Sequence, residues 1–174
     1  MSQEVDKPKS DKIAEELQKR KDLKQIVDVE EKKTKLVIFT LMDSYYALFG
    51  EDVKEILPLS KIYFVPGSPN YILGIVNVRG DIQSVIDIRI FLGYPDTQRA
   101  DKNRIVIAEK GGVRSGILVD SVEDVFDIPI SAIQQVISTL SDNIRFFVVG
   151  ETSYKHNSVT LLDIGKLFEK INAE

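Results

Sequence analysis

The chain of 174 residues contains no cysteine and a single histidine. Without cysteine, a disulfide framework, a thiolate nucleophile and a cysteine-ligated metal are all excluded. The one histidine, His156, lies in a polar run that predicts a solvated turn, and the sequence around it supplies neither metal ligands nor a nucleophile elbow. We therefore expect no enzyme activity, no metal site and no cofactor.

Long apolar runs and an excess of basic residues are also absent. The opening MSQEVDKPKSDK is charged where a signal peptide would be apolar. No segment approaches the ~18 apolar residues that a membrane-spanning helix needs. The formal net charge of −4 argues against sequence-independent binding to nucleic acid, which requires a basic face. These features predict a soluble cytoplasmic protein that neither inserts into a membrane nor binds nucleic acid.

Two local clusters have residue types that could form a phosphate- or metal-binding site, but their sequences favour a structural role. Gly111 and Gly112 fall between two predicted strands, which indicates a hairpin turn rather than a phosphate-binding loop. The acidic residues between Asp120 and Asp127 do not match an EF-hand loop, so they predict a solvated acidic edge. The aromatic residues of the β-like segments, among them Tyr63, Phe64, Phe146 and Phe147, are expected to fill the core.

Residues 1–33 differ in composition from the rest of the chain. They are rich in Lys, Glu, Asp and Gln and contain few apolar residues that could offset the entropy of ordering. We expect a charged N-terminal arm that is flexible or partly helical. A solvated arm, a helix packed on the domain and a partner-binding helix all remain open. Residues 34–174 are expected to form the folded domain.

Many short β segments separated by turn residues follow the arm. The strongest strand predictions are these: 36–41, 45–49, 72–78, 82–88, 104–108, 115–119, 145–150 and 158–162. The apolar spacing of Glu51–Leu57 predicts a short helix, and Ile164–Ile171 predicts a C-terminal helix capped by Asp163. The polar stretch around 94–103 is expected to join two lobes. The pattern as a whole predicts a mostly β protein built from barrels or a sandwich.

Several motifs occur in an order that resembles a known family. Gly74-Ile75-Val76-Asn77-Val78-Arg79-Gly80, followed by Val85-Ile86-Asp87-Ile88-Arg89, resembles the signature of CheW-type chemotaxis coupling proteins. Val65–Pro69 precedes this signature, and Gly116–Val122 and Leu161–Leu167 match the second half of the family pattern. The similarity spans residues 35–170. Ser84 departs from the pattern, since the family usually has proline there.

The resemblance implies a fold, a function and partners. The fold would be two small five-stranded Src-homology-type β-barrels packed together, with short helices and a C-terminal helix. The protein would be a scaffold that couples the cytoplasmic tip of methyl-accepting chemoreceptors to the regulatory domain of the histidine kinase CheA. It would act in the cytoplasm at membrane-associated receptor arrays.

The resemblance also implies site residues. Arg79, on a strand otherwise rich in Ile and Val, needs a partner because an unpaired buried charge is costly. Glu55 is the first candidate for this partner and Asp87 the second, although Asp87 would instead bind Arg89. The Glu55–Arg79 ion pair is expected to shape a receptor-binding groove, although its role could be purely structural. The groove residues are expected to be Val53, Glu55, Ile56, Leu57, Gly74, Asn77 and Arg79. Val53, Ile56 and Leu57 are placed on one side of the short helix, with a role in the core as the alternative. The kinase contact is expected to include Ile117, Leu118 and Val119.

Two other functions remain open at this stage. The same domain could serve a surface-motility or pilus signalling array, which the sequence cannot distinguish from swimming chemotaxis. It could also be a small-molecule-sensing domain, although no phosphate-binding motif supports that interpretation.

Overall fold

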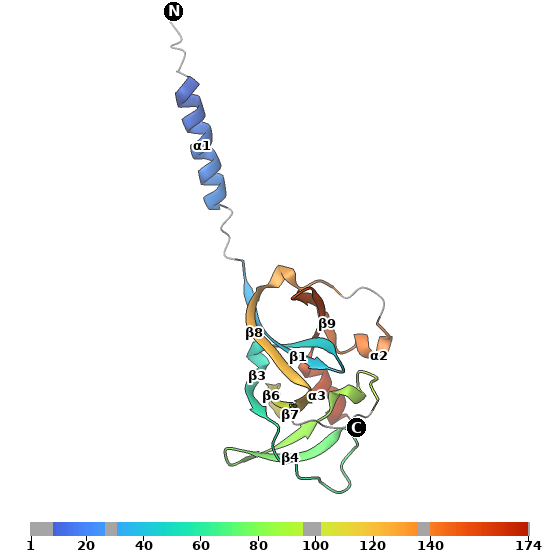
Figure 1. Ribbon diagram of the computed structural model, residues 1–174. Coiled ribbons are helices and arrows are strands. Elements are labelled where there is room, and N and C mark those ends of the chain that lie inside the picture. Colours follow the sequence, from blue (N-terminus) through green and yellow to red (C-terminus); the bar gives the residue numbers. More distant parts are fainter. Residues whose placement is uncertain (1–8, 27–30, 96–101, 136–139, 174) are drawn as a thin grey trace, which may run out of the picture. The chain divides into compact units, whose positions relative to one another are not determined.

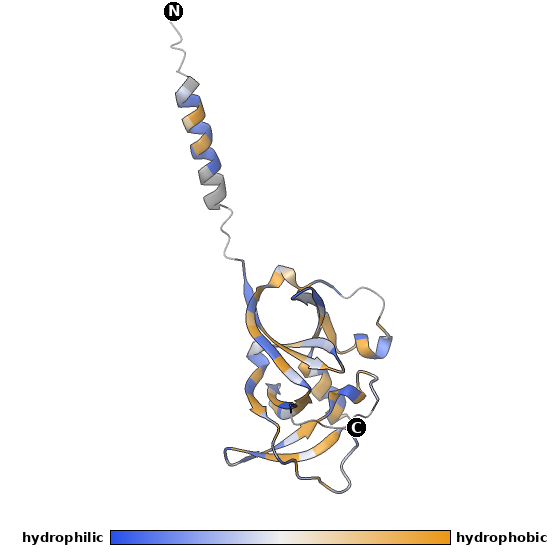
Figure 2. Cartoon of the chain, viewed as in Figure 1, coloured by the Kyte–Doolittle hydropathy of each residue, from blue (hydrophilic) through white to orange (hydrophobic). Residues whose placement is uncertain are grey.

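The computed structural model describes residues 9–26, 31–95, 102–135 and 140–173 (Figure 1). The chain divides into two units, Met1–Lys32 and Lys33–Glu174. The first unit contains helix α1 (Lys9–Ile26), whose described side chains, from residue 10 to residue 20, are all exposed. Hydrophilic and hydrophobic residues are interspersed along it (Figure 2). Within the described ranges, no helix has the length and apolar character needed to cross a membrane.

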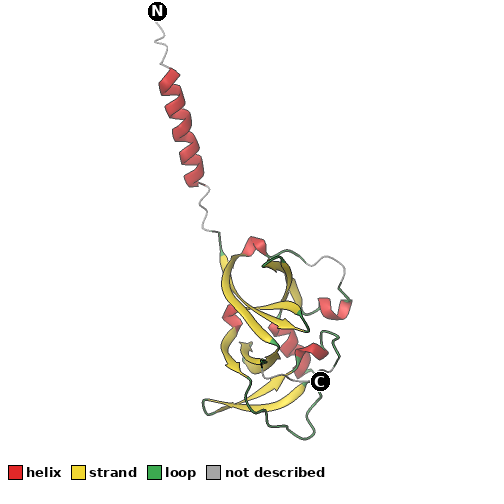
Figure 3. Cartoon of the chain, viewed as in Figure 1, coloured by secondary structure: helices red, strands yellow, loops and turns green. Residues whose placement is uncertain are grey.

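The second unit is mostly β structure, as the sequence predicts (Figure 3). Its described residues form two five-stranded sheets. The first sheet has the order β8-β1-β2-β10-β9 and comprises β1 (Lys33–Leu41), β2 (Ser44–Phe49), β8 (Ser121–Pro129), β9 (Val148–Tyr154) and β10 (Asn157–Leu162). The second has the order β3-β6-β7-β5-β4 and comprises β3 (Val53–Pro58), β4 (Ile72–Val78), β5 (Asp81–Ile86), β6 (Arg104–Lys110) and β7 (Val113–Val119).

Short helical segments connect the strands. They are the single turns η1 (Gly50–Asp52), η2 (Ile88–Ile90) and η3 (Ile130–Ala132), and the helices α2 (Asp142–Arg145) and α3 (Ile164–Asn172). The prediction of a C-terminal helix is confirmed. Asp163 precedes α3 and accepts hydrogen bonds from the backbone N–H groups of Gly165 and Lys166, which satisfies two donors of the first turn.

Both sheets curl into small barrels (Figure 1). Single β-bridges outside the strands, Tyr63 with Ile75 and Gln134 with Glu151, extend the pairing of the two edge strands β4 and β9. The two packed Src-homology-type barrels implied by the family resemblance are therefore present.

The barrels are not built from the two halves of the chain in turn. The predicted lobe boundary near 94–103 is therefore wrong. The strands on either side of it, β5 and β6, belong to the same sheet. The other sheet takes β1 and β2 from the beginning of the domain and β8 to β10 from its end, joined by parallel pairing of β2 with β10. Residues 96–101 of the predicted connection lie outside the described residues.

The buried apolar side chains of the described residues form three clusters. One lies in the first barrel and includes Leu36, Ile38 and Leu161, and a second lies in the other barrel and includes Val76 and Ile107. The third joins the two sheets and α3, and includes Phe39, Leu48, Val106, Val119 and Leu167. Because the largest cluster draws on both sheets, the barrels share a core and stabilise each other.

Glu51–Leu57 is not a helix, because only Gly50–Asp52 turns helically and β3 begins at Val53. The ladder between β3 and β6 contains a bulge, so Val53 pairs with Ala108 while Glu55 pairs with Ile107. A bulge inserts one residue and shifts the alternation of side chains. Burial nevertheless alternates along β3, with Val53, Glu55 and Leu57 less exposed than Lys54 and Ile56, so Val53 and Ile56 lie on opposite faces of the strand.

Candidate functional site

The predicted partners Glu55 and Arg79 are brought together between β3 and the β4–β5 turn. Arg79 Nη2 donates a hydrogen bond to Glu55 Oε1 at 2.7 Å. The expectation that Arg79 lies on a strand in a buried setting is wrong, because β4 ends at Val78 and the Arg79 side chain is 82% exposed. The Glu55 side chain is only 21% exposed. The half-buried carboxylate therefore anchors a guanidinium whose remaining N–H groups face solvent.

The turn that carries Arg79 is a two-residue loop. Val78 pairs with Asp81 across it, and Arg79 and Gly80 have positive φ angles of 54° and 98°. Asn77 is exposed, and its Oδ1 accepts a hydrogen bond of 2.8 Å from the Gly80 N–H. The signature Asn-Val-Arg-Gly thus spans the last residues of a strand and its hairpin turn.

Gly74 has a structural role within the same hairpin. It is buried, its φ is 139°, and a Cβ atom at this position would overlap the carbonyl group of Tyr63. The N–H and carbonyl of Tyr63 both bond to Ile75, at 2.8 and 2.9 Å. The absence of a side chain at Gly74 therefore lets the Tyr63 segment approach β4, and the buried Gly74 offers no side chain to the predicted groove.

The remaining predicted groove residues do not share one face. Val53 packs against the core between the sheets and Leu57 against the core of the second barrel, whereas Ile56 is 37% exposed. Alternation along β3 separates Leu57 from Ile56. The exposed members of the predicted set are therefore Ile56, Asn77 and Arg79, and only Arg79 contacts Glu55.

The predicted kinase contacts lie in the core. Ile117, Leu118 and Val119 are at most 1% exposed, and β7 is the central strand of its sheet. Their side chains cannot touch a partner while the domain is folded, so the sequence-based placement of a contact surface here is wrong. An uninterrupted apolar run in a strand is typical of burial on both faces, which is the physical reason.

Some aromatic residues that the sequence assigns to the core are exposed. The exposed fraction is 54% for Tyr63, 72% for Phe64 and 51% for Phe146, while Phe147 is buried. Large apolar side chains at the surface are frequent in protein interfaces. Tyr63 and Phe64 lie in the connection between β3 and β4, just before Pro66, and not within one of the strands that form the core.

The prediction that Asp87 binds Arg89 is confirmed, and the pair is buried. Arg89 Nε and Nη2 donate to the two carboxylate oxygens of Asp87 at 2.8 and 2.6 Å, and the Arg89 side chain is 3% exposed. Arg89 Nη1 also lies 3.8 Å from Asp120 Oδ1. Asp120 in turn accepts from the backbone N–H of Met42 at 2.7 Å. This network links η2 of the second barrel to the β1–β2 turn of the first.

The acidic residues after Asp120 have internal partners. Asp124 accepts from the Tyr154 hydroxyl at 3.1 Å, and Asp127 pairs with Lys35 at 2.9 Å. Among the described side chains, no group of three His, Asp or Glu residues converges on a point that could hold a metal ion. Glu123 and Asp127 are exposed, as expected of an acidic edge, whereas Asp120 and Asp124 are half-buried.

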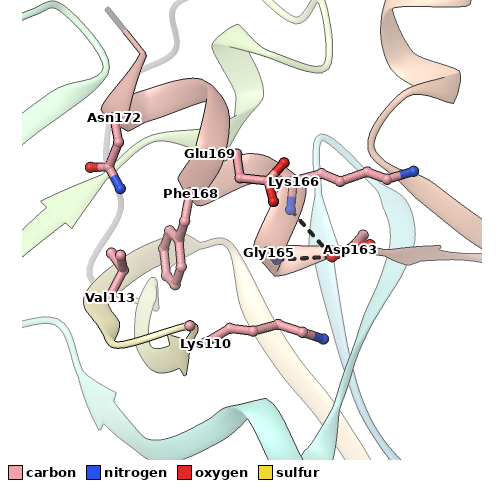
Figure 4. Close-up of a pocket in the computed structure, with 9 residues that line it drawn as sticks. Lys110, Val113, Asp163, Gly165, Lys166, Phe168, Glu169 and Asn172 are labelled. Carbon is pink, nitrogen blue, oxygen red and sulfur yellow. Dashed lines mark hydrogen bonds between the residues drawn. The ribbon is translucent and has the colours of Figure 1, made fainter.

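A pocket of about 470 Å³ lies between α3 and the β6–β7 turn (Figure 4). Two of its charged groups are engaged within the fold. Asp163 caps α3, and Lys110 Nζ lies 3.0 Å from Asp52 Oδ2. That hydrogen bond to Asp52 raises the pKa of Lys110, while partial burial opposes the rise. These contacts occupy two of the charged groups with which a small-molecule-sensing site would otherwise select its ligand.

Comparison with known proteins decides the family. The sequence model described as CheW-like domain matches residues 35–172. The chain belongs to the CheW-like domain family. The "Probable chemotaxis protein CheW" of Rhizobium etli is 27% identical over 139 residues, which cover 80% of this chain and 90% of that protein. The "Chemotaxis protein CheW" of Bacillus subtilis is 26% identical over 140 residues, again covering 80% and 90%.

A solved CheW structure has the same architecture. The crystal structure of the scaffolding protein TtCheW from Thermoanaerobacter tengcongensis superposes with a TM-score of 0.67 and 29% sequence identity, covering 76% of this chain and 86% of that one. Since relatives named CheW match along most of both chains, this CheW-like protein is a chemotaxis scaffold or adaptor.

Proposed function

We propose that this CheW-like protein couples methyl-accepting chemoreceptors to a CheA-type histidine kinase, and that it does so as an adaptor without enzyme activity. It would act in the cytoplasm at receptor arrays beneath the membrane. In receptors of this kind the cytoplasmic tip is a helical hairpin. A surface of this protein that binds the tip therefore needs apolar contacts with a few polar anchors.

The observation that carries the proposal is the Glu55–Arg79 pair. The two residues are 24 positions apart in sequence, and their 2.7 Å contact joins β3 to the β4–β5 turn. The guanidinium is largely exposed, and Ile56 and Asn77 offer apolar and polar surface on the same two elements. Exposed arginine with free donors is well suited to carbonyl and carboxylate groups of a partner.

The adaptor interpretation also agrees with the chemistry of the chain. Its one histidine, His156, is exposed in the β9–β10 turn, and the sequence has no cysteine. Most nucleophilic and acid–base schemes need a perturbed group beside a second catalytic group. Binding surfaces, rather than a reaction centre, therefore account for the features of this domain.

Replacement of Arg79 by alanine tests the receptor site. We expect Arg79→Ala to weaken binding of a receptor-tip fragment about tenfold, measured by calorimetry, because an anchor is lost. Thermal unfolding should remain cooperative with nearly the same Tm, since exposed ion pairs contribute little stability. Arg114→Ala is the matched control, because Arg114 is an exposed arginine on β7 of the same barrel. Unchanged affinity in Arg79→Ala would refute the assignment of this surface.

A further inference from the structure

Arg79 occupies a backbone conformation that its residue type disfavours. In a two-residue hairpin loop with positive φ at both positions, the first position favours Asn, Asp or Gly. Arg79 has φ 54° there, where its Cβ atom crowds the backbone. A residue held in such a conformation needs surrounding structure that keeps it there.

The ion pair with Glu55 is a weak candidate for that support. Its guanidinium is 82% exposed, and exposed pairs are screened by water and salt. The long arginine side chain also has several rotatable bonds through which it could leave Glu55 without constraining its own backbone. Part of the support comes from the β4–β5 ladder, which pairs Val78 with Asp81 across the loop, and a further contact is needed to fix the loop amide itself.

Asn77 supplies that contact. Its Oδ1 accepts a hydrogen bond of 2.8 Å from the N–H of Gly80, the residue that follows Arg79. Asn77 lies on β4, opposite Ile82 of β5, so its own backbone is fixed by the ladder. The bond consequently ties the amide after Arg79 to a rigid strand. Short side chains such as Asn are suited to this local bonding of turn amides.

We infer that Asn77 is a positioning residue for the partner surface: it holds the Arg79–Gly80 loop in the left-handed conformation that directs the Arg79 guanidinium to Glu55. Asn77 thus acts through Arg79 instead of by contacting the receptor itself. This inference rests on the proposed receptor site, and it assigns the exposed asparagine of the signature a role in shaping that site.

A double-mutant cycle tests the inference by calorimetry with a receptor-tip fragment. We expect Asn77→Ala to weaken binding about three- to fivefold, and the Asn77→Ala/Arg79→Ala double variant to bind no more weakly than Arg79→Ala alone. Asn77→Asp keeps an oxygen acceptor and should restore most of the affinity. Asn157→Ala is the control, because Asn157 is an exposed asparagine at the start of β10, beside the β9–β10 turn. If the losses multiply in the double variant, Asn77 contacts the partner directly and the inference is wrong.

A second measurement decides the matter without a partner. Nuclear Overhauser effects between the amide and Hα protons of Arg79 report the sign of its φ in the full chain. We expect Asn77→Ala to lose the positive φ, while Asn77→Asp retains it. An unchanged Arg79 conformation in Asn77→Ala would overturn the positioning role. Failure of the wild-type chain to bind the receptor fragment would refute the proposed function, and this spectroscopic result would still decide the role of Asn77.

Discussion

The arginines of this CheW-like protein show how burial sets the role of one residue type. Arg89 is 3% exposed and bidentate on Asp87, whereas Arg79 is 82% exposed and contacts Glu55 through one nitrogen. A buried pair that loses one member leaves an uncompensated charge in the interior. Loss of the exposed Arg79 leaves the Glu55 carboxylate, which is only partly buried and retains some access to water. Burial therefore gives Arg89 a role in stability, and it leaves Arg79 accessible for the proposed receptor contact.

We expect Arg89→Ala to lower the free energy of unfolding by about 3–5 kcal/mol, because Asp87 would remain buried and unpaired. Lys35→Ala is the control, since the Lys35–Asp127 pair is more than half exposed on both sides. Its loss should cost less than about 1 kcal/mol. Urea unfolding measures both values. Equal effects for the two variants would contradict the distinction between buried and exposed pairs.

Tyr46 provides a prediction for alkaline pH. Burial, together with the 2.6 Å contact between its hydroxyl and that of Tyr94, raises the pKa of Tyr46 above its ordinary value. The folded state thus retains the proton after the unfolded chain would release it. The corresponding stability is fully present below about pH 10, the ordinary pKa of tyrosine, and is lost as the pH rises toward the folded-state value.

Absorbance of phenolate tests this behaviour. The chain contains six tyrosines. In the folded protein we expect Tyr46→Phe to leave the amplitude of the ionisation step near pH 10 unchanged, because Tyr46 does not ionise there. A decrease equivalent to one tyrosine would show that Tyr46 titrates normally.

At the scale of single elements, the sequence identifies strands well where glycine and polar turns flank them. The segments around β1, β2, β4 and β5 follow this rule, and Asp163 correctly marks the start of α3. There are three exceptions. The sequence predicts a helix in place of β3, because Val53, Ile56 and Leu57 have helical spacing and the sequence does not reveal their pairing with β6. β8 is missing from the predicted strands, and the strand predicted at 145–150 begins only at Val148.

The β4 strand supports a prediction about barrel closure. Gly74→Ala should lower the free energy of unfolding by about 2–4 kcal/mol, because the new methyl group would overlap the Tyr63 carbonyl and the residue would keep a φ of 139°. Gly67→Ala is the matched control for Gly74→Ala. Gly67 also has a positive φ, 79°, but an added Cβ atom there would have no atom within 4 Å.

Gly67→Ala should therefore cost only about 1 kcal/mol, the price of the left-handed conformation alone. Thermal and urea unfolding compare the two alanine variants. Similar losses in both would mean that the close approach of Tyr63 contributes nothing to the stability of the domain.

At the scale of the whole molecule, composition and motif order predict two barrels but not how the chain builds them. The parallel pairing of β2 with β10 joins residues more than 100 positions apart, and no local pattern encodes it. The same limit explains the kinase residues. Ile117–Val119 read as a plausible apolar edge until the sheet order places β7 at the centre. Surface and core can be separated only after strand pairing is known.

For the site residues, too, the sequence predicts one part and the folded structure supplies the other. The family resemblance identifies Glu55 as the partner of Arg79 from their positions in the motif, and the two do meet. The exposure of Arg79 and the bond from Gly80 to Asn77 depend on the geometry of the hairpin turn. Motif order can thus select residues, whereas their accessibility and orientation require the folded chain.

The central claim is that one chain holds a receptor tip and a kinase regulatory domain at the same time. Sedimentation velocity of the full chain with a receptor-tip fragment and the regulatory domain of a cognate CheA-type kinase tests it most directly. We predict a ternary complex at micromolar concentrations that forms only when this protein is present. Arg79→Ala should reduce the amount of this complex. Binding of each partner only in the absence of the other, or of neither, would contradict coupling by this chain.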